Sequence, residues 1–90
     1  MAKIISESSV QLIKKYSDEI GLSFPMDDEG SGYAILKFFE SMDADIGGMK
    51  HEGIPVDDKL VDDVSRIIDE FLYDGREEID YADLERRLKA

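Results

Sequence analysis

Hydrophobic side chains recur with the period of an α-helix in four segments of the chain, the first of which starts near residue 8. Ser8 opens a capping-box pattern with Gln11, and Gly21 suits the left-handed position that commonly follows a helix. Between them the apolar positions lie three or four residues apart: Val10, Ile13, Tyr16 and Ile20. The pattern predicts a helix from Ser8 to about Ile20.

A second helix is predicted from about Tyr33 to Asp45, after a loop that Pro25 interrupts. One face of this segment carries four apolar residues at helical spacing: Ile35, Phe39, Met42 and Ile46. Gly47 and Gly48 follow and predict its end, and we expect this helix to be the most buried element. A strand over residues 33–39 is the main alternative, because a short apolar run does not fix the period.

The third helix has the clearest pattern in the chain. Asp57 is a good N-cap, and Val56 with Val61 can form a hydrophobic staple across the helix start. The apolar stripe that follows consists of Leu60, Val64, Ile67 and Phe71. The adjacent Asp74 and Gly75 predict the end of this helix.

A fourth helix is predicted to begin at Asp80, which acts as its N-cap. Its inward side consists of Tyr81, Leu84 and Leu88. Four amphipathic helices in a chain of this length predict an all-α fold, a compact bundle of four helices that forms a single domain over residues 1–90.

The net charge of the chain gives information about its function rather than about its fold. The chain carries 22 Asp and Glu residues against 11 Lys and Arg residues, a formal net charge of -11. Residues 1–45 hold nine acids and four bases, and residues 46–90 hold thirteen acids and seven bases, so the excess is spread over the whole surface. Such a surface repels nucleic acid and anionic membranes and attracts basic proteins.

The composition also removes several kinds of chemistry. The chain has no Cys, which excludes disulfides, a thiol nucleophile and a Cys-ligated zinc site. No nucleophile stands in a catalytic motif, and no spacing selects a catalytic pair of carboxylates, so we expect a protein that is not an enzyme. The polar N-terminus and the lack of a long apolar run indicate a soluble, cytoplasmic protein, monomeric or weakly dimeric.

The third helix carries the candidate binding surface. Asp58, Asp62, Asp69 and Tyr73 fall within an arc of about 60° opposite the apolar stripe. Acids around a tyrosine anchor are typical of a surface that binds a basic protein. Four residues of the following connection would extend this surface: Glu77, Glu78, Asp80 and Asp83. The alternative is an ordinary solvated face, with Tyr73 folded over the helix end.

Three further patterns match known motifs only in part. Residues 74–84 resemble the second half of an EF-hand through Ile79 and Asp83, but Arg76 stands where a calcium ligand belongs. Ser41 lies in the nearest match to the Asp-Ser-Leu motif of acyl carrier proteins, but late in its helix. A third group could supply metal ligands but lacks the second His of a zinc-protease helix: Asp43, Asp45, His51 and Glu52. We therefore expect no metal and no cofactor.

Residues 53–89 resemble the C-terminal half of colicin D-type immunity proteins. The shared features are a long amphipathic helix, a short acidic connection ending in Glu78-Ile79-Asp80, and a short last helix. That family consists of four-helix bundles that block a tRNA-cleaving toxin with an acidic face. The resemblance implies an inhibitor or immunity-type protein that acts as a nucleic-acid mimic, with a nuclease or another nucleic-acid-acting enzyme as its basic partner. The alternative is a structural or regulatory module that binds through an apolar groove between helices; an EF-hand-like or acyl-carrier-like protein is favoured less.

Overall fold

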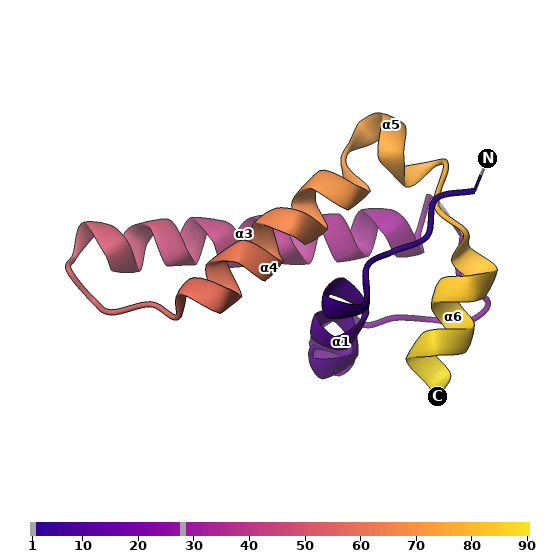
Figure 1. Ribbon diagram of the computed structural model, residues 1–90, viewed down its shortest axis with the longest axis horizontal. Coiled ribbons are helices and arrows are strands. Elements are labelled where there is room, and N and C mark those ends of the chain that lie inside the picture. The colour runs from indigo at the N-terminus through magenta and orange to yellow at the C-terminus, as the bar shows by residue number, and fades with distance from the viewer. Residues whose placement is uncertain (1, 28) are drawn as a thin grey trace.

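Among the residues that the structure describes, six helical segments follow one another, and four of them have nine residues or more (Figure 1). The computed structural model describes residues 2–27 and 29–90, without the side chains of residues 73 and 74. The segments are α1 (Glu7–Lys15), α2 (Ser17–Ile20), α3 (Ser31–His51), α4 (Asp58–Phe71), α5 (Tyr73–Arg76) and α6 (Tyr81–Lys89). The described residues form no strand, so the all-α prediction is confirmed and the strand alternative for residues 33–39 is wrong.

The helices pack around one core. Helices α3 and α4 cross each other, and α1 contacts both α4 and α6 at the other end of the molecule (Figure 1). The fully buried side chains include members of each predicted apolar stripe: Val10, Ile13, Ile35, Phe39, Val64, Ile67, Phe71 and Leu84. Burying one such side chain stabilises the fold by roughly 1.5–3 kcal/mol, so the stripes account for the packing of the four long helices.

The start of α1 differs from the prediction. Its N-cap is Ser6 rather than Ser8, and the Ser6 hydroxyl accepts from the backbone N–H of Ser9. Ser6 takes this role because Glu70 of α4 accepts hydrogen bonds from its hydroxyl at 2.8 Å and from its backbone N–H at 3.4 Å. The prediction of one helix is wrong at Tyr16, where α1 ends and the four-residue α2 begins. The predicted end of the segment is confirmed, because Gly21 follows α2 in the left-handed conformation with φ 75°.

Helix α3 is longer than predicted. It begins at Ser31 and runs through Gly47 and Gly48 to His51, so the predicted end at the glycine pair is wrong. A glycine in a helix interior costs only about 1 kcal/mol relative to alanine, which does not stop a helix that keeps its hydrogen bonds. The helix ends instead at His51, with Glu52 as its C-cap. Gly53 follows with φ 76°, and the N–H of Ile54 donates to the carbonyl of Met49 at 2.9 Å.

Helices α4 and α6 begin as predicted. Asp57 accepts from the N–H of Lys59 at 3.0 Å, and Asp80 accepts from the N–H of Asp83 at 3.0 Å. The end of α4 is earlier than predicted, since the helix stops at Phe71 and a single-turn helix, α5, follows over Tyr73–Arg76. The break coincides with Leu72, whose extended backbone (ψ 140°) redirects the chain.

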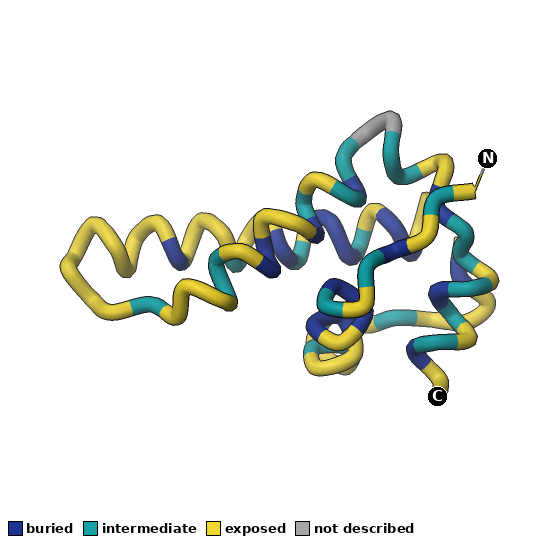
Figure 2. Tube along the Cα trace, viewed as in Figure 1, coloured by how far each residue is buried: buried dark blue, intermediate teal, exposed yellow. Residues whose placement is uncertain are grey.

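The distal part of α3, the loop after it and the start of α4 project from the rest of the molecule (Figure 1). We call residues 43–58 the arm. Almost all of its residues are exposed; Ile46 is buried and Val56 is half-buried (Figure 2). The prediction that α3 is the most buried element therefore holds only for its first half, where Ser31, Gly32, Ile35, Leu36 and Phe39 are buried.

Candidate protein-binding site

The outer side of α4 presents three of the predicted acids to solvent. Asp58, Asp62 and Asp69 are exposed, and none of them lies within 4.0 Å of a cationic group in the described part of the chain. Asp62 and Asp69 line the same open hollow of about 450 Å³. Asp58 lies one turn before Asp62, where α4 joins the arm. The helical period thus brings Asp62 and Asp69 to one hollow and places Asp58 one turn away from it.

The cations in this hollow are anchored to other groups. The Lys3 ammonium donates to the backbone carbonyl of Glu70 at 2.9 Å. Arg66 donates to the hydroxyl of Ser8 and lies 3.5 Å from Asp63. These contacts tie Lys3 and Arg66 to backbone, to α1 and to a neighbouring acid, which leaves the carboxylates of Asp62 and Asp69 available to an incoming cation.

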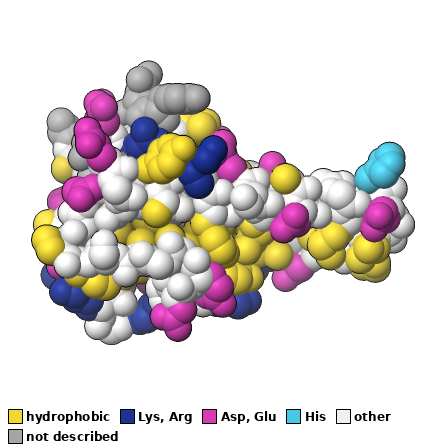
Figure 3. Space-filling model, turned by 180° about the vertical axis from the view of Figure 1, so that it is seen from behind, with side chains coloured by type: hydrophobic (Ala, Val, Ile, Leu, Met, Phe, Trp, Pro, Cys, Tyr) yellow, Lys and Arg dark blue, Asp and Glu magenta, His cyan; other side chains and the backbone are white. Residues whose placement is uncertain are grey.

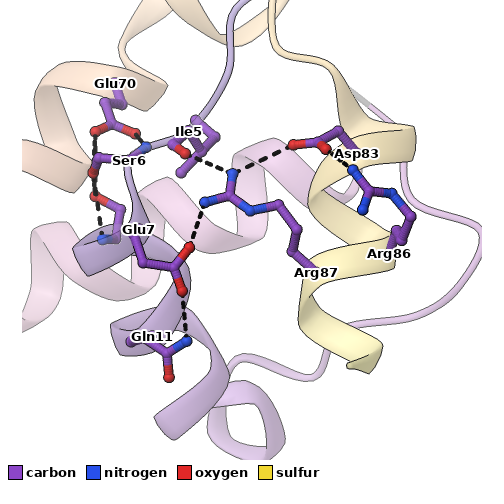
Figure 4. Close-up of polar contacts among 9 residues, drawn as sticks. Ile5, Ser6, Glu7, Gln11, Glu70, Asp83, Arg86 and Arg87 are labelled. Carbon is purple, nitrogen blue, oxygen red and sulfur yellow. Dashed lines mark hydrogen bonds and ion pairs between the residues drawn. The ribbon is translucent and has the colours of Figure 1, made fainter.

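Two acids of α4 that the sequence did not single out are engaged within the fold. Glu70 accepts from Ser6, and also from the hydroxyl of Ser9 at 3.3 Å, so it ties the start of α1 to α4 (Figure 4). Asp63 is buried and lies 2.8 Å from the ammonium of Lys59. Its spacing of four residues from Lys59 is a sequence signal for such a pair, whereas no local signal points to Glu70.

The connection before α6 divides its predicted acids into two kinds. Glu77 and Glu78 are exposed. Asp80 caps α6, and the Asp83 side chain is only 16% exposed, with Arg87 at 3.3 Å and Arg86 in contact (Figure 4). The carboxylates of Asp80 and Asp83 are therefore engaged within the fold, and Glu77 and Glu78 remain open to a partner. The side chain of Tyr73 lies outside the described residues, so its role as an anchor stays a prediction.

Arg87 is the centre of the polar contacts between α6 and the start of the chain. Its guanidinium donates to the Ile5 carbonyl at 2.7 Å and to the Glu7 carboxylate at 2.7 Å (Figure 4). The hydrogen bond from Arg87, assisted by one from Gln11, holds the pKa of Glu7 below its ordinary value. These contacts fix the first residues against the last helix.

The remaining candidate segments are the arm, Ser41 and the residues that resemble an EF-hand. The four potential metal ligands of the arm are exposed, and no group of three or more acids and histidines among the described residues is placed to hold a metal ion. Ser41 is exposed on α3. The segment that resembles an EF-hand forms the α5 turn and the cap of α6, and its Ile79 pairs with Lys3 in an isolated bridge.

No family model, curated protein or solved structure matches the chain. The resemblance to colicin D-type immunity proteins accordingly stays a prediction from the sequence. Within residues 2–27 and 29–90, no helix is both long enough and apolar enough to cross a membrane.

Proposed function

We propose that the protein is a non-enzymatic inhibitor of the immunity type, which binds a basic partner and covers its cationic site. The observation that carries this proposal is the outer side of α4, where Asp58, Asp62 and Asp69 are exposed and take part in no ion pair among the described residues. Over these eleven positions the helix rises about 16 Å, so one face offers a line of charges with fixed spacing. A rigid line of carboxylates is complementary to a surface that binds a phosphate backbone.

The net charge of -11 favours a partner that itself acts on nucleic acid, either a toxin or another nuclease. Such an enzyme gathers Lys and Arg at its substrate site, and an acidic protein approaches that site faster than a neutral one. Nucleic acid and anionic lipid would be repelled by the same charge. In this proposal Glu77 and Glu78 extend the binding surface, and Tyr73 supplies a packed anchor.

A second candidate, binding through an apolar surface, is supported by one feature of the body. Tyr16 and Phe38 are half-buried with ring centroids 5.5 Å apart, and Figure 3 shows hydrophobic side chains gathered where the arm meets the body. Salt separates the two candidates. An acidic interface weakens as ionic strength rises, and an apolar one does not.

The test begins with capture of the partner at low salt from the native source, identification by mass, and binding kinetics with the purified partner. We expect Asp62→Lys with Asp69→Lys to slow association much more than Asp18→Lys with Glu19→Lys, a matched pair of exposed acids on α2. Each variant must first melt like the parent. Equal effects from the two pairs would contradict a special role for α4, and binding that is independent of salt would shift the function to the apolar surface.

A further inference from the structure

The arm is a part of the structure that the acidic face of α4 does not explain. Helix α3 has 21 residues and is therefore about 31 Å long, but its packing against the body is concentrated in its first half. Beyond Met42, which is half-buried, Ile46 is the last buried residue of the helix. Past Ile46 the helix continues for five residues that make little contribution to the core.

The tip of the arm exposes apolar side chains. Met49 is 36% exposed and Ile54 is 44% exposed, and both belong to the small set of large hydrophobic residues that the described structure leaves open to solvent. The adjacent glycines do not serve the fold, since a Cβ atom at Gly47 or Gly48 would meet nothing within 4 Å. An exposed apolar tip on a weakly packed helix end is typical of a surface that another molecule covers.

The arm that carries these side chains is acidic, and we call its five acids the rim. The arm carries one lysine, Lys50, and one histidine, His51, against five acids: Asp43, Asp45, Glu52, Asp57 and Asp58. None of these acids lies in an ion pair within the described structure. Figure 3 shows acidic side chains beside hydrophobic ones along the arm. The arm therefore combines an apolar tip with a formal charge of -4 when His51 is neutral.

This charge selects among the molecules that could cover the tip. A second copy of the chain would bring another arm of charge -4 to the contact, and an anionic membrane would repel it as well. A cationic segment gains from the rim and from the tip at once. We propose that the arm tip binds a basic amphipathic segment of the partner, with apolar side chains on Met49 and Ile54 and Lys or Arg side chains against the rim; this proposal rests on the inhibitor function proposed above.

A defined probe tests the proposal without the native partner. The probe is a short synthetic helix with a leucine face and a lysine face, and its control keeps every lysine but has glutamine in place of leucine. Backbone amide NMR shifts locate the binding site, and titrations give the affinity. We expect shifts in residues 46–56, and Met49→Ser with Ile54→Ser should weaken the leucine probe about tenfold, as for a packed apolar contact. Ile4→Ser is the matched control, because Ile4 is also exposed and belongs to the N-terminal segment, which lies at the opposite end of the molecule from the arm (Figure 1).

Each other outcome overturns the proposal in a distinguishable way. Shifts confined to the outer side of α4, with equal binding of both probes, would remove the role of the arm and leave the acidic inhibitor function intact. Shifts centred on Tyr16 and Phe38 would place the apolar contact on the body. Failure of both probes to bind at low salt would contradict the arm proposal and the acidic function together. Concentration-dependent shifts of the arm without probe would assign the tip to a second copy.

Discussion

Glu85 shows how a single carboxylate can hold a loop that has little regular structure. The backbone N–H of Met26 donates to Glu85 at 2.9 Å, and the ammonium of Lys89 lies 3.2 Å from its other oxygen. These hydrogen bonds, that of Met26 first, hold the pKa of Glu85 below its ordinary value. Met26 is buried, so the contact fixes the loop before α3 against the last helix.

The sign of this pKa shift predicts a pH dependence. A carboxyl group with a lowered pKa in the folded chain stabilises the fold above its unfolded value of 4.5, and this stabilisation is lost as pH falls through the folded pKa. We expect Glu85→Gln to lower the melting temperature at neutral pH, because a neutral amide is the weaker acceptor. The gap to the parent should shrink between about pH 5 and pH 3.

Thermal melts of both proteins by circular dichroism across this pH range measure the gap. Glu77→Gln, which removes an exposed carboxylate from the same acidic half of the chain, is the control for net charge. A gap that stays constant down to the lowest pH would contradict the role of the Glu85 carboxylate.

Two glycines of α3 differ in the space around them: Gly32 is closely packed, and Gly47 faces open space. A Cβ atom at Gly32 would lie 2.7 Å from Cγ of Arg76 and would also collide with the hydroxyl of Tyr81, which donates to the Arg76 carbonyl at 2.8 Å. We expect Gly32→Ala to cost about 1–3 kcal/mol through this overpacking. Gly47→Ala meets open space, so it should stabilise the protein by about 0.5–1 kcal/mol through helix propensity.

Urea unfolding of the two variants in parallel compares their free energies of unfolding with that of the parent. Because the amino-acid change is identical, the difference in sign isolates the local environment. Equal effects at both positions would contradict the close approach of α5 and α6 to the start of α3.

At the scale of elements, α4 carries the core on one side and the candidate binding surface on the other. Val64 and Ile67 are completely buried, whereas Asp62 is exposed. We expect Val64→Asp or Ile67→Asp to abolish the cooperative melt, because burying an unpaired carboxylate costs several kcal/mol and a small domain has about 5–15 kcal/mol of stability. Asp62→Ala should melt like the parent. Calorimetry measures both, and a native-like transition in either Asp variant would show that this side of α4 is not core.

The sequence predicts those features of the elements that depend on neighbouring residues. The N-caps Asp57 and Asp80 and the two faces of α4 are confirmed because capping and helical period are local properties. The cap at Ser6 could not be predicted in the same way, because a tertiary contact with Glu70 selects it over Ser8.

The same distinction applies to the candidate site. The exposure of Asp62 and Asp69 follows from the helical period, and it was predicted correctly. The engagement of Asp83 with Arg87 arises only when α6 packs against the first residues of the chain, and the sequence pattern contains no sign of it. The length of α3 was missed because a glycine pair weakens a helix without ending it.

At the scale of the whole molecule, paired and unpaired charged side chains occupy different regions. The described ion pairs lie on α3, on α4, on α6 and between α6 and the start of α1, so the body neutralises part of its own charge. Within the described part of the chain, the acids of the arm and Asp62 and Asp69 of α4 lie in no ion pair. With principal extents of 40 × 26 × 20 Å, the molecule presents its uncompensated charge along an elongated shape, which suits insertion into a concave basic site.

The pairing of the first residues with the last elements also sets an order of events during synthesis. The N–H of Lys3 donates to the carbonyl of Glu78, and the carbonyl of Lys3 accepts from the N–H of Asp80. The carbonyl of Ile5 accepts a hydrogen bond from Arg87, which lies 82 positions later in the sequence. These hydrogen bonds form only after residues 78–87 have been made, so residues 3–5 are synthesised well before the groups that hold them in place. Glu70 is made earlier than these residues, so its side chain offers Ser6 a long-range hydrogen-bond partner before residues 78–87 exist.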